Sequence, residues 1–220
     1  MLQKIPYTVS SSLIDEVKLH LPSADTKISL NEPTGNFFYD PWSIKPEYKG
    51  TIWETLLNTL PISYGEARIM VLTHGTTYMS HTDIDDRFHL NLKGQYSYLI
   101  DLDSDQMFPT VLDCQWYEMD TGRRHVAANF GSHERVQLVV RKLLHNGNLT
   151  QYKQVTIKPI CVNPRFEFDD IVSPWLNKAN KKEKMSDFKI LDDGVSFNLN
   201  ISAIEELEFI PTNKFKVIIK

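Results

Sequence analysis

The stretch RHVAANFGSHERVQLVVRKLL, residues 124–144, contains two apolar runs on either side of a short turn that includes glycine. In the second run, from Arg135 to Val140, the side chains of a strand would point alternately to two faces. Arg135, Gln137 and Val139 then share one face, and the residues between them form an apolar face. β-branched residues at this spacing, bounded by turn residues, predict two consecutive strands.

Runs of the same kind occur on both sides of this stretch, between residues 67 and 162. They comprise ARIMVLT, FHLNL, YSYLIDL, TVLDCQWYEM and YKQVTIKPICV, and they are separated by turns such as THGTT, LKGQ and DSDQ. Many short strands at regular spacing predict an all-β sandwich or barrel, a class that includes the jelly roll. Helical patterns do not alternate with these runs, and the sequence has no G-x-G-x-x-G or G-x-x-x-x-G-K motif, so a Rossmann-like fold is disfavoured.

The segments before these strands have other patterns. Residues 11–21 carry leucine, isoleucine and valine at a loosely helical spacing with serines ahead of them, which predicts a short amphipathic helix. Residues 51–60 predict a second short helix that ends at Pro61. Residues 31–50 are rich in proline, glycine and aromatic side chains, so we expect a long ordered loop, which in compact domains is often functional.

The expected fold class is mainly β, with short N-terminal helices and a C-terminal α+β extension. Residues 1–60 are expected to form helices and an aromatic loop that pack on the core, residues 61–160 the β core, and residues 161–220 the extension. Within the last range, Lys178 to Asp187 is a run of charged residues, which predicts a solvated linker or exposed loop.

The composition is that of an ordinary globular protein. Of 220 residues, 41% are hydrophobic and 24% charged, and the formal net charge is −4. This charge, without a long basic stripe, argues against nucleic acid and anionic membranes as partners. No signal peptide and no run of eighteen apolar residues is visible, and Cys114 and Cys161 lie outside any C-x-x-C pattern. We therefore expect a cytoplasmic protein in a reducing compartment.

A dense cluster of charged residues and histidines, HTDIDDRFHL, occupies residues 81–90. His81 and Asp83 are two residues apart, so on a strand or at its end both side chains leave the same face. Such a pair, joined by one distant histidine, forms the facial triad of non-haem Fe(II) oxygenases. The best candidate for that histidine is His125, which opens a strand, and His133 in the turn GSHE is the rival.

Arg135 is the second unusual residue, because it lies among residues that suit the interior of a barrel. Burying an arginine without an anion is costly. A carboxylate ligand would satisfy the guanidinium through two parallel hydrogen bonds. The sequence therefore predicts a carboxylate-binding site at Arg135.

Three blocks of the sequence resemble a known family. They are LTHGTTYMSHTD (residues 72–83), DRFHLNL (residues 86–92) and RRHVAANFGSHERVQLVV (residues 123–140). They are similar to blocks of the Fe(II)- and 2-oxoglutarate-dependent oxygenases, within the aspartyl/asparaginyl β-hydroxylase-like group that includes cis-proline hydroxylases. The resemblance covers roughly residues 62 to 142, and it implies a double-stranded β-helix, which is a jelly roll.

The resemblance also implies roles for single residues. His81, Asp83 and His125 would hold Fe(II), and Arg135 would bind the distal carboxylate of 2-oxoglutarate. The other positions that match the group are cosubstrate contacts at Arg87 and His89 and an asparagine near the site at Asn129. Met70 stands where the group has a serine that binds the cosubstrate, so Thr73 or Tyr78 would have to supply that hydrogen bond.

The function that the resemblance implies is a dioxygenase that uses Fe(II), 2-oxoglutarate and O2 and releases succinate and CO2. Its substrate would be a free amino acid or a peptidyl Asp, Asn or Pro side chain. Two alternatives stay open: a metal-binding jelly roll for sensing or assembly without oxygenase activity, and a purely structural sandwich. We expect Asp85 and Asp86 to be solvated turn residues, and His74 and His145 to be exposed beside turns.

Overall fold

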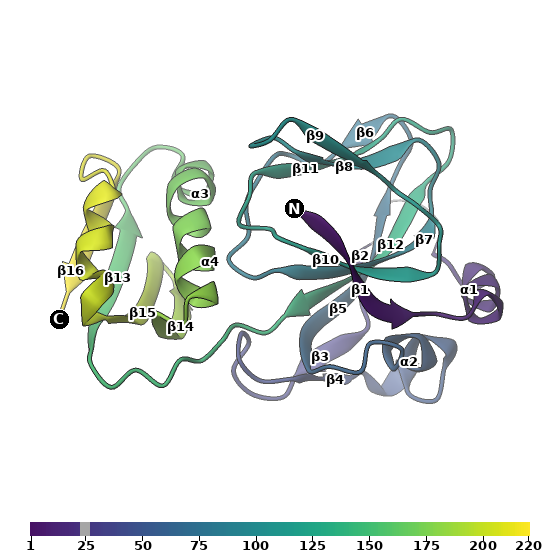
Figure 1. Cartoon of the computed structure of the whole chain (residues 1–220), viewed down its shortest axis with the longest axis horizontal. Coiled ribbons are helices and arrows are strands. Elements are labelled where there is room, and N and C mark those ends of the chain that lie inside the picture. The colour runs from purple at the N-terminus through teal and green to yellow at the C-terminus, as the bar shows by residue number, and fades with distance from the viewer. Residues whose placement is uncertain (23–26) are drawn as a thin grey trace. The chain divides into compact units, whose positions relative to one another are not determined.

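The computed structural model describes residues 1–22 and 27–220. Their contacts divide the chain into two compact units (Figure 1). The first unit comprises residues 1–80 and 85–143, and the second comprises residues 144–220 together with the short segment 81–84.

The first unit is built from antiparallel sheets. The larger sheet has six strands, in the order β1 (Leu2–Thr8), β10 (Gln115–Met119), β7 (Arg87–Lys93), β12 (Arg135–Lys142), β5 (Tyr64–Leu72) and β2 (Lys27–Ser29). The smaller sheet has four, in the order β6 (Thr76–Thr77), β11 (His125–Asn129), β8 (Ser97–Asp101) and β9 (Gln106–Pro109). Among the described residues no sheet closes into a barrel, so the expectation of a mainly β fold is confirmed only at this coarser level.

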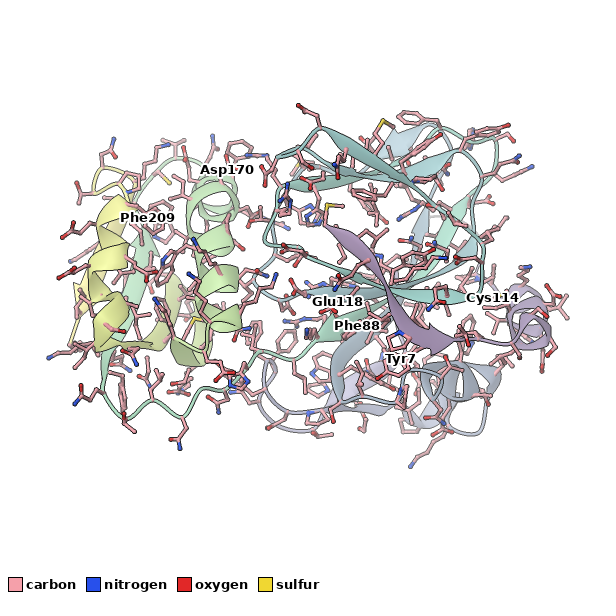
Figure 2. The ribbon with its side chains drawn as sticks, in the orientation of Figure 1. Tyr7, Phe88, Cys114, Glu118, Asp170 and Phe209 are labelled. Atoms are coloured by element: carbon pink, nitrogen blue, oxygen red, sulfur yellow. The ribbon has the colours of Figure 1, made fainter. Side chains whose placement is uncertain are left out.

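One face of the larger sheet carries the main apolar core. The predicted helices are present as α1 (Ser11–Lys18), capped by the Ser10 hydroxyl, and α2 (Ile52–Leu57), and both contribute to this core. Phe88 of β7 belongs to the cluster and Tyr7 of β1 packs against it (Figure 2). Further members are Ile14, Val17, Trp53, Leu56, Ile69, Leu90, Trp116, Val136 and Leu138.

The aromatic segment 31–50 is only partly irregular. It contains a small sheet of β3 (Asn31–Pro33) and β4 (Trp42–Ile44), followed by the 3-10 turn η1 (Pro46–Tyr48). The buried Asn31 amide ties this segment to β5, because its Nδ2 donates to the Gly65 carbonyl at 2.8 Å and its Oδ1 accepts from the Ala67 amide at 2.7 Å.

The other face of the larger sheet is buried as well, but it is polar. On it Gln137 pairs across the strands with Asn91, and Val139 pairs with His89. The two sheets of the first unit face each other on this side (Figure 1). A small apolar cluster joins them, with members from both sheets: Leu72, Met119, Leu99 and Ala127. Polar groups buried between two sheets need hydrogen-bond partners or a ligand.

The second unit is a small α+β structure. Its elements are β13 (Tyr152–Pro159), α3 (Pro164–Glu167), the π-helix η2 (Phe168–Val172), α4 (Ser173–Lys181), β14 (Met185–Leu191), β15 (Gly194–Asn200), the 3-10 helix η3 (Ile201–Phe209) and β16 (Phe215–Ile219). The antiparallel sheet has the order β14-β15-β13-β16, the arrangement of split β-α-β folds. β13, inside the range 61–160 expected for the core, belongs to this sheet.

The expectation of a solvated linker at residues 178–187 is wrong. α4 runs to Lys181 and β14 begins at Met185, and Ala179 and Met185 are buried. Lys178, Lys181 and Lys182 are exposed while Ala179 and Asn180 between them are buried, so a high local charge does not prevent regular structure. No helix of the described residues combines the length and apolar character needed to cross a bilayer.

Candidate metal centre

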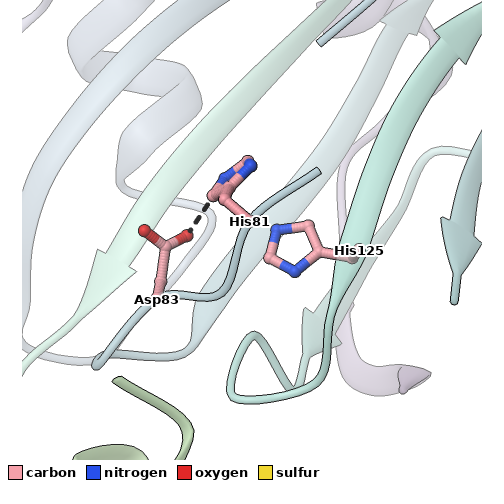
Figure 3. Close-up of side chains that lie close together, drawn as sticks. All are labelled: His81, Asp83 and His125. Atoms are coloured by element: carbon pink, nitrogen blue, oxygen red, sulfur yellow. Dashed lines mark ion pairs between the residues drawn. The ribbon is translucent and has the colours of Figure 1, made fainter. Parts of the chain in front are cut away.

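The structure brings His81, Asp83 and His125 together (Figure 3). One ligand atom from each residue lies within 4.8 Å of the others, and His81 Nε2 is 3.7 Å from Asp83 Oδ2. His125 is buried, whereas His81 and Asp83 are half-buried. Within the described part of the chain, no other three histidine, cysteine or carboxylate side chains form such a group.

His81 and Asp83 lie on a short segment without an extended strand, between β6 and β7. Thr82, between the two ligands, is buried, and its hydroxyl donates a short hydrogen bond to the Asp169 carbonyl. Asn177 Nδ2 donates to the Ile84 carbonyl at 3.4 Å. The segment is therefore fixed through its own backbone and through Thr82, while residues 81 and 83 present their side chains to the centre.

The hydrogen bond of His125 selects the tautomer that a metal requires. Its Nδ1 lies 2.8 Å from the Arg123 carbonyl oxygen, which can only accept, so Nδ1 carries the proton. Nε2 then has the lone pair with which an imidazole binds a metal. The Arg123 side chain donates to Asp101 Oδ2 at 2.6 Å, which holds this turn in place.

Two imidazole nitrogens and one carboxylate oxygen are a donor set that suits a divalent transition metal. Three protein ligands leave further coordination positions for a substrate or cosubstrate. The structure thus supports a metal site formed by His81, Asp83 and His125. The rival ligand His133, two residues before Arg135, is exposed in its turn. A metal bound there would be crowded against Arg135, and a site that uses His125 avoids this.

Arg135 is a buried cation whose hydrogen-bond partners are neutral. Only 2% of the residue is exposed. Its Nε donates to Thr110 Oγ1 at 3.3 Å, and its Nη2 makes a short hydrogen bond to Gln137 Oε1. No carboxylate of the described residues forms an ion pair with it, and burial lowers the pKa of Arg135 to about 10. The guanidinium is charged at neutral pH, so an anionic ligand would remove a real energetic cost.

Two hydroxyl groups lie beside Arg135 that the sequence did not single out. Thr110 accepts from the guanidinium, and its amide donates to the Ser97 carbonyl at 2.8 Å. The buried Ser97 hydroxyl has no hydrogen-bond partner. A Cβ on Gly94 would lie 2.8 Å from Ser97 Oγ and 3.5 Å from Arg135 Cγ, so only glycine leaves these groups their space. A guanidinium with the Thr110 hydroxyl bound to it, and the Ser97 hydroxyl in the same neighbourhood, suits a carboxylate.

A chain of amides fixes His89 near the same site. His89 Nδ1 lies 3.2 Å from Gln137 Oε1, while Gln137 Nε2 makes a short bond to Asn91 Oδ1, whose Nδ2 donates to the Val111 carbonyl at 2.8 Å. Since Gln137 offers its oxygen to the ring, Nδ1 carries the proton. Nε2 of His89 is buried without a hydrogen-bond partner. Burial first, and the charge of Arg135 second, lower the pKa of His89 to about 3, so the ring is neutral at pH 7.

The low pKa of His89 predicts a pH dependence of stability in the metal-free protein. The folded value of about 3 lies below the ~6.5 of an unfolded imidazole, so below about pH 6.5 the unfolded state binds the additional proton. The contribution of neutral His89 to the free energy of unfolding is therefore at its full value above pH 6.5. It is lost as the pH falls, by about 2 kcal/mol between pH 7 and pH 5. In urea unfolding at both pH values, His89→Gln should lose less free energy of unfolding than wild type by about this amount. Equal losses would contradict the neutral, buried state of His89.

The remaining predicted cosubstrate residues have partners of their own. Arg87 Nη1 binds Asp85 Oδ1 at 2.5 Å. Thr73 Oγ1 lies 3.2 Å from Thr76 Oγ1 in the turn after β5. Tyr78 donates to the Val71 carbonyl at 3.3 Å. Burial lowers the pKa of Arg135, and the charge of Tyr78 partly offsets this effect.

Asn129 holds the turn between β11 and β12. Its Nδ2 donates to the carbonyls of Leu72, at 3.0 Å, and His133, at 2.8 Å, and its Oδ1 accepts from the Gly131 amide at 3.1 Å. These three bonds account for the burial of Asn129. The amide therefore supports the position of the strand that begins with Arg135.

The expectation that Asp85 and Asp86 are solvated is wrong, because their exposed fractions are 3% and 8%. Their charges are met by arginine and backbone partners from distant parts of the chain. His74 and His145 are exposed, as predicted.

No model of a protein family matches the chain, and no curated protein matches it significantly.

Proposed function

We propose that this chain is an Fe(II)- and 2-oxoglutarate-dependent dioxygenase with a jelly-roll core. It would hydroxylate an amino-acid side chain and release succinate and CO2. The observation that carries the proposal is the buried Arg135, which has neutral partners and shares the polar interior with His89. A metal site alone does not require a buried guanidinium, whereas a cosubstrate with two carboxylates does.

In this proposal His81, Asp83 and His125 hold Fe(II). Bound iron, with O2 and the keto acid, supplies the oxidising power for attack on a C–H bond. Arg135 binds the distal carboxylate of 2-oxoglutarate, with the Thr110 and Ser97 hydroxyls as additional donors. Because Arg135 is buried, its charge acts in a low dielectric and positions the cosubstrate more strongly than a surface charge would.

The proposed substrate is a free amino acid or a peptidyl Asp, Asn or Pro side chain, as the resemblance to the aspartyl/asparaginyl β-hydroxylase-like group implies. The chain's net charge of −4 gives no support to nucleic acid as the substrate. The rival function is a metal-binding module without oxygenase activity. It is supported by the triad, but it leaves the burial of Arg135 without a purpose.

The test is an anaerobic titration of metal-free protein with Fe(II) and then with 2-oxoglutarate, followed by admission of air and measurement of succinate. Wild type should bind 2-oxoglutarate only with metal present and release succinate slowly even without substrate. The control for replacement of Arg135 is Arg165→Met, which alters an arginine whose side chain is 91% exposed and should behave as wild type. Metal binding without any 2-oxoglutarate binding would favour the rival module. If the protein binds no metal, both the dioxygenase and the metal-binding module are excluded.

A further inference from the structure

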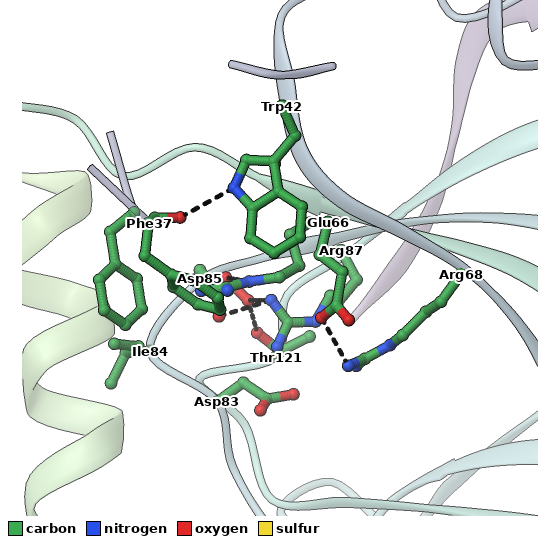
Figure 4. A network of polar contacts seen from close by, with 12 residues as sticks. Phe37, Trp42, Glu66, Arg68, Asp83, Ile84, Asp85, Arg87 and Thr121 are labelled. Atoms are coloured by element: carbon green, nitrogen blue, oxygen red, sulfur yellow. Dashed lines mark hydrogen bonds and ion pairs between the residues drawn. The ribbon is translucent and has the colours of Figure 1, made fainter. Parts of the chain in front are cut away.

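Asp85 is a buried carboxylate at the point where the chain leaves the segment that carries His81 and Asp83. Both of its carboxylate oxygens are bound by arginines (Figure 4). Oδ1 accepts from Arg87 Nη1 at 2.5 Å, and Oδ2 accepts a short hydrogen bond from Arg141 Nε. One buried carboxylate between two buried arginines carries a large desolvation cost, which stability alone does not explain.

Hydrogen bonds also hold the backbone around Asp85. The Asp85 carbonyl accepts from Arg87 Nη1 at 3.0 Å and from Thr121 Oγ1 at 2.7 Å. The Asp86 carbonyl accepts from the Lys142 amide at 2.9 Å, and Asp86 Oδ1 accepts from the Thr121 amide at 3.3 Å. Asp85 and Asp86 are thus anchored to β7, to β12 and to the turn before β11.

Aromatic rings cover Arg141 on its outer side. Its guanidinium carbon lies 4.3 Å from the ring centroid of Phe37 and 4.8 Å from that of Phe38. Trp42 packs edge-on against Phe37 at 5.0 Å and donates from its indole nitrogen to the Phe37 carbonyl at 3.2 Å. Cation–π contacts and the exclusion of water strengthen the bond between Arg141 and Asp85. The aromatic segment is therefore part of this anchor.

We propose that Asp85, held by Arg141, is a positioning residue that sets the placement of the metal ligands His81 and Asp83. This inference rests on the metal site of the proposed function. The segment 81–84 has no extended strand of its own; the Thr82 hydroxyl and the Ile84 carbonyl hold it from within, and Asp85 holds it on the C-terminal side. Asp85 is the first residue after this segment, and arginines bind both of its carboxylate oxygens. A shift there would move Asp83, two residues away, out of reach of a metal shared with His125.

The test is a titration of Asp85→Asn with Co(II), which reports the ligand geometry through its d–d absorption. Asparagine keeps the shape of the side chain and removes the charge that holds Arg141. We expect Co(II) affinity to fall by about 10- to 100-fold, as for other residues that orient metal ligands, and the absorption band to shift. A loss of stability alone leaves the affinity of the folded protein unchanged, so unfolding curves of both proteins accompany the titration.

Thr121 provides a second, milder pair of variants in case Asp85→Asn fails to fold. Thr121→Val removes the hydroxyl that donates to the Asp85 carbonyl, and Thr121→Ser keeps it. Valine should weaken Co(II) binding and shift the spectrum, and serine should restore both. Glu118→Gln, which removes a surface ion pair with Lys142 in the same sheet, is the control and should bind Co(II) as wild type does.

The outcomes separate this inference from the proposed function. If wild type binds Co(II) and Asp85→Asn or Thr121→Val binds it within twofold with an unchanged spectrum, the positioning role is refuted while the metal site stands. If wild type does not bind Co(II), the metal site and the positioning role both fall. A spectrum that shifts in Thr121→Val and returns in Thr121→Ser supports the inference.

Discussion

His125→Ala is expected to lower the affinity of the chain for Fe(II) or Co(II) by more than about 100-fold. Residues that only orient a ligand are worth about 10- to 100-fold in metal affinity, and removal of a ligand should cost more. His125 opens β11 in a buried position, with its Nδ1 proton directed at the Arg123 carbonyl. Anaerobic titration monitored by Co(II) absorption measures the loss directly.

His133→Ala is the matched control for this variant. His133 lies in the turn before β12, is exposed, and is absent from the group of potential ligands. Its replacement should leave metal affinity within about twofold of wild type. If His133→Ala abolishes binding while His125→Ala retains it, the ligand assignment is wrong.

Arg135→Met is expected to have two large effects of opposite sign. Binding of 2-oxoglutarate to the metal-loaded protein should weaken by about 2–5 kcal/mol, or roughly 30-fold to several thousandfold, because a buried charged partner is lost. The metal-free protein should become more stable, by about 1–3 kcal/mol, because a buried cation without an anionic partner is replaced by an apolar side chain. Isothermal titration with 2-oxoglutarate measures the first effect and urea unfolding of the metal-free protein the second.

The combination of these two effects distinguishes a ligand site from a structural arginine. If Arg135 served only the fold, Arg135→Met would destabilise the protein and leave 2-oxoglutarate binding unchanged. The exposed Arg165 again provides the control, since Arg165→Met should change neither quantity. Retained binding in Arg135→Met would contradict the assignment of the distal carboxylate.

Local patterns of the sequence were sufficient to predict strands such as β12 and the three residues of the triad. The alternation from Arg135 to Val140 correctly predicts which residues share a face, because side-chain direction in a strand depends only on the period of two. The spacing of His81 and Asp83, with His125 opening a strand, predicts the three residues that the structure groups as potential ligands. The jelly roll, iron and 2-oxoglutarate remain predictions.

Long-range partners could not be predicted from the sequence. Asp85 looks like a solvated turn residue because its partner Arg141 is 56 positions away. Ser97 and Thr110 come from separate parts of the chain, and only the pairing of the strands brings them to Arg135. β1 was not expected either, since its outer residues are polar and its stability comes from pairing with β10.

The larger sheet has a buried apolar face and a buried polar face. Substitutions on these two faces should differ in their effect on the amount of protein in a cell. Substitutions on the apolar face remove core contacts and should send the chain to degradation. Substitutions on the polar face, such as Arg135→Met, should leave a folded and even longer-lived protein. Damaged copies of this second kind would accumulate at normal abundance, so protein levels in cells cannot report whether the site is intact.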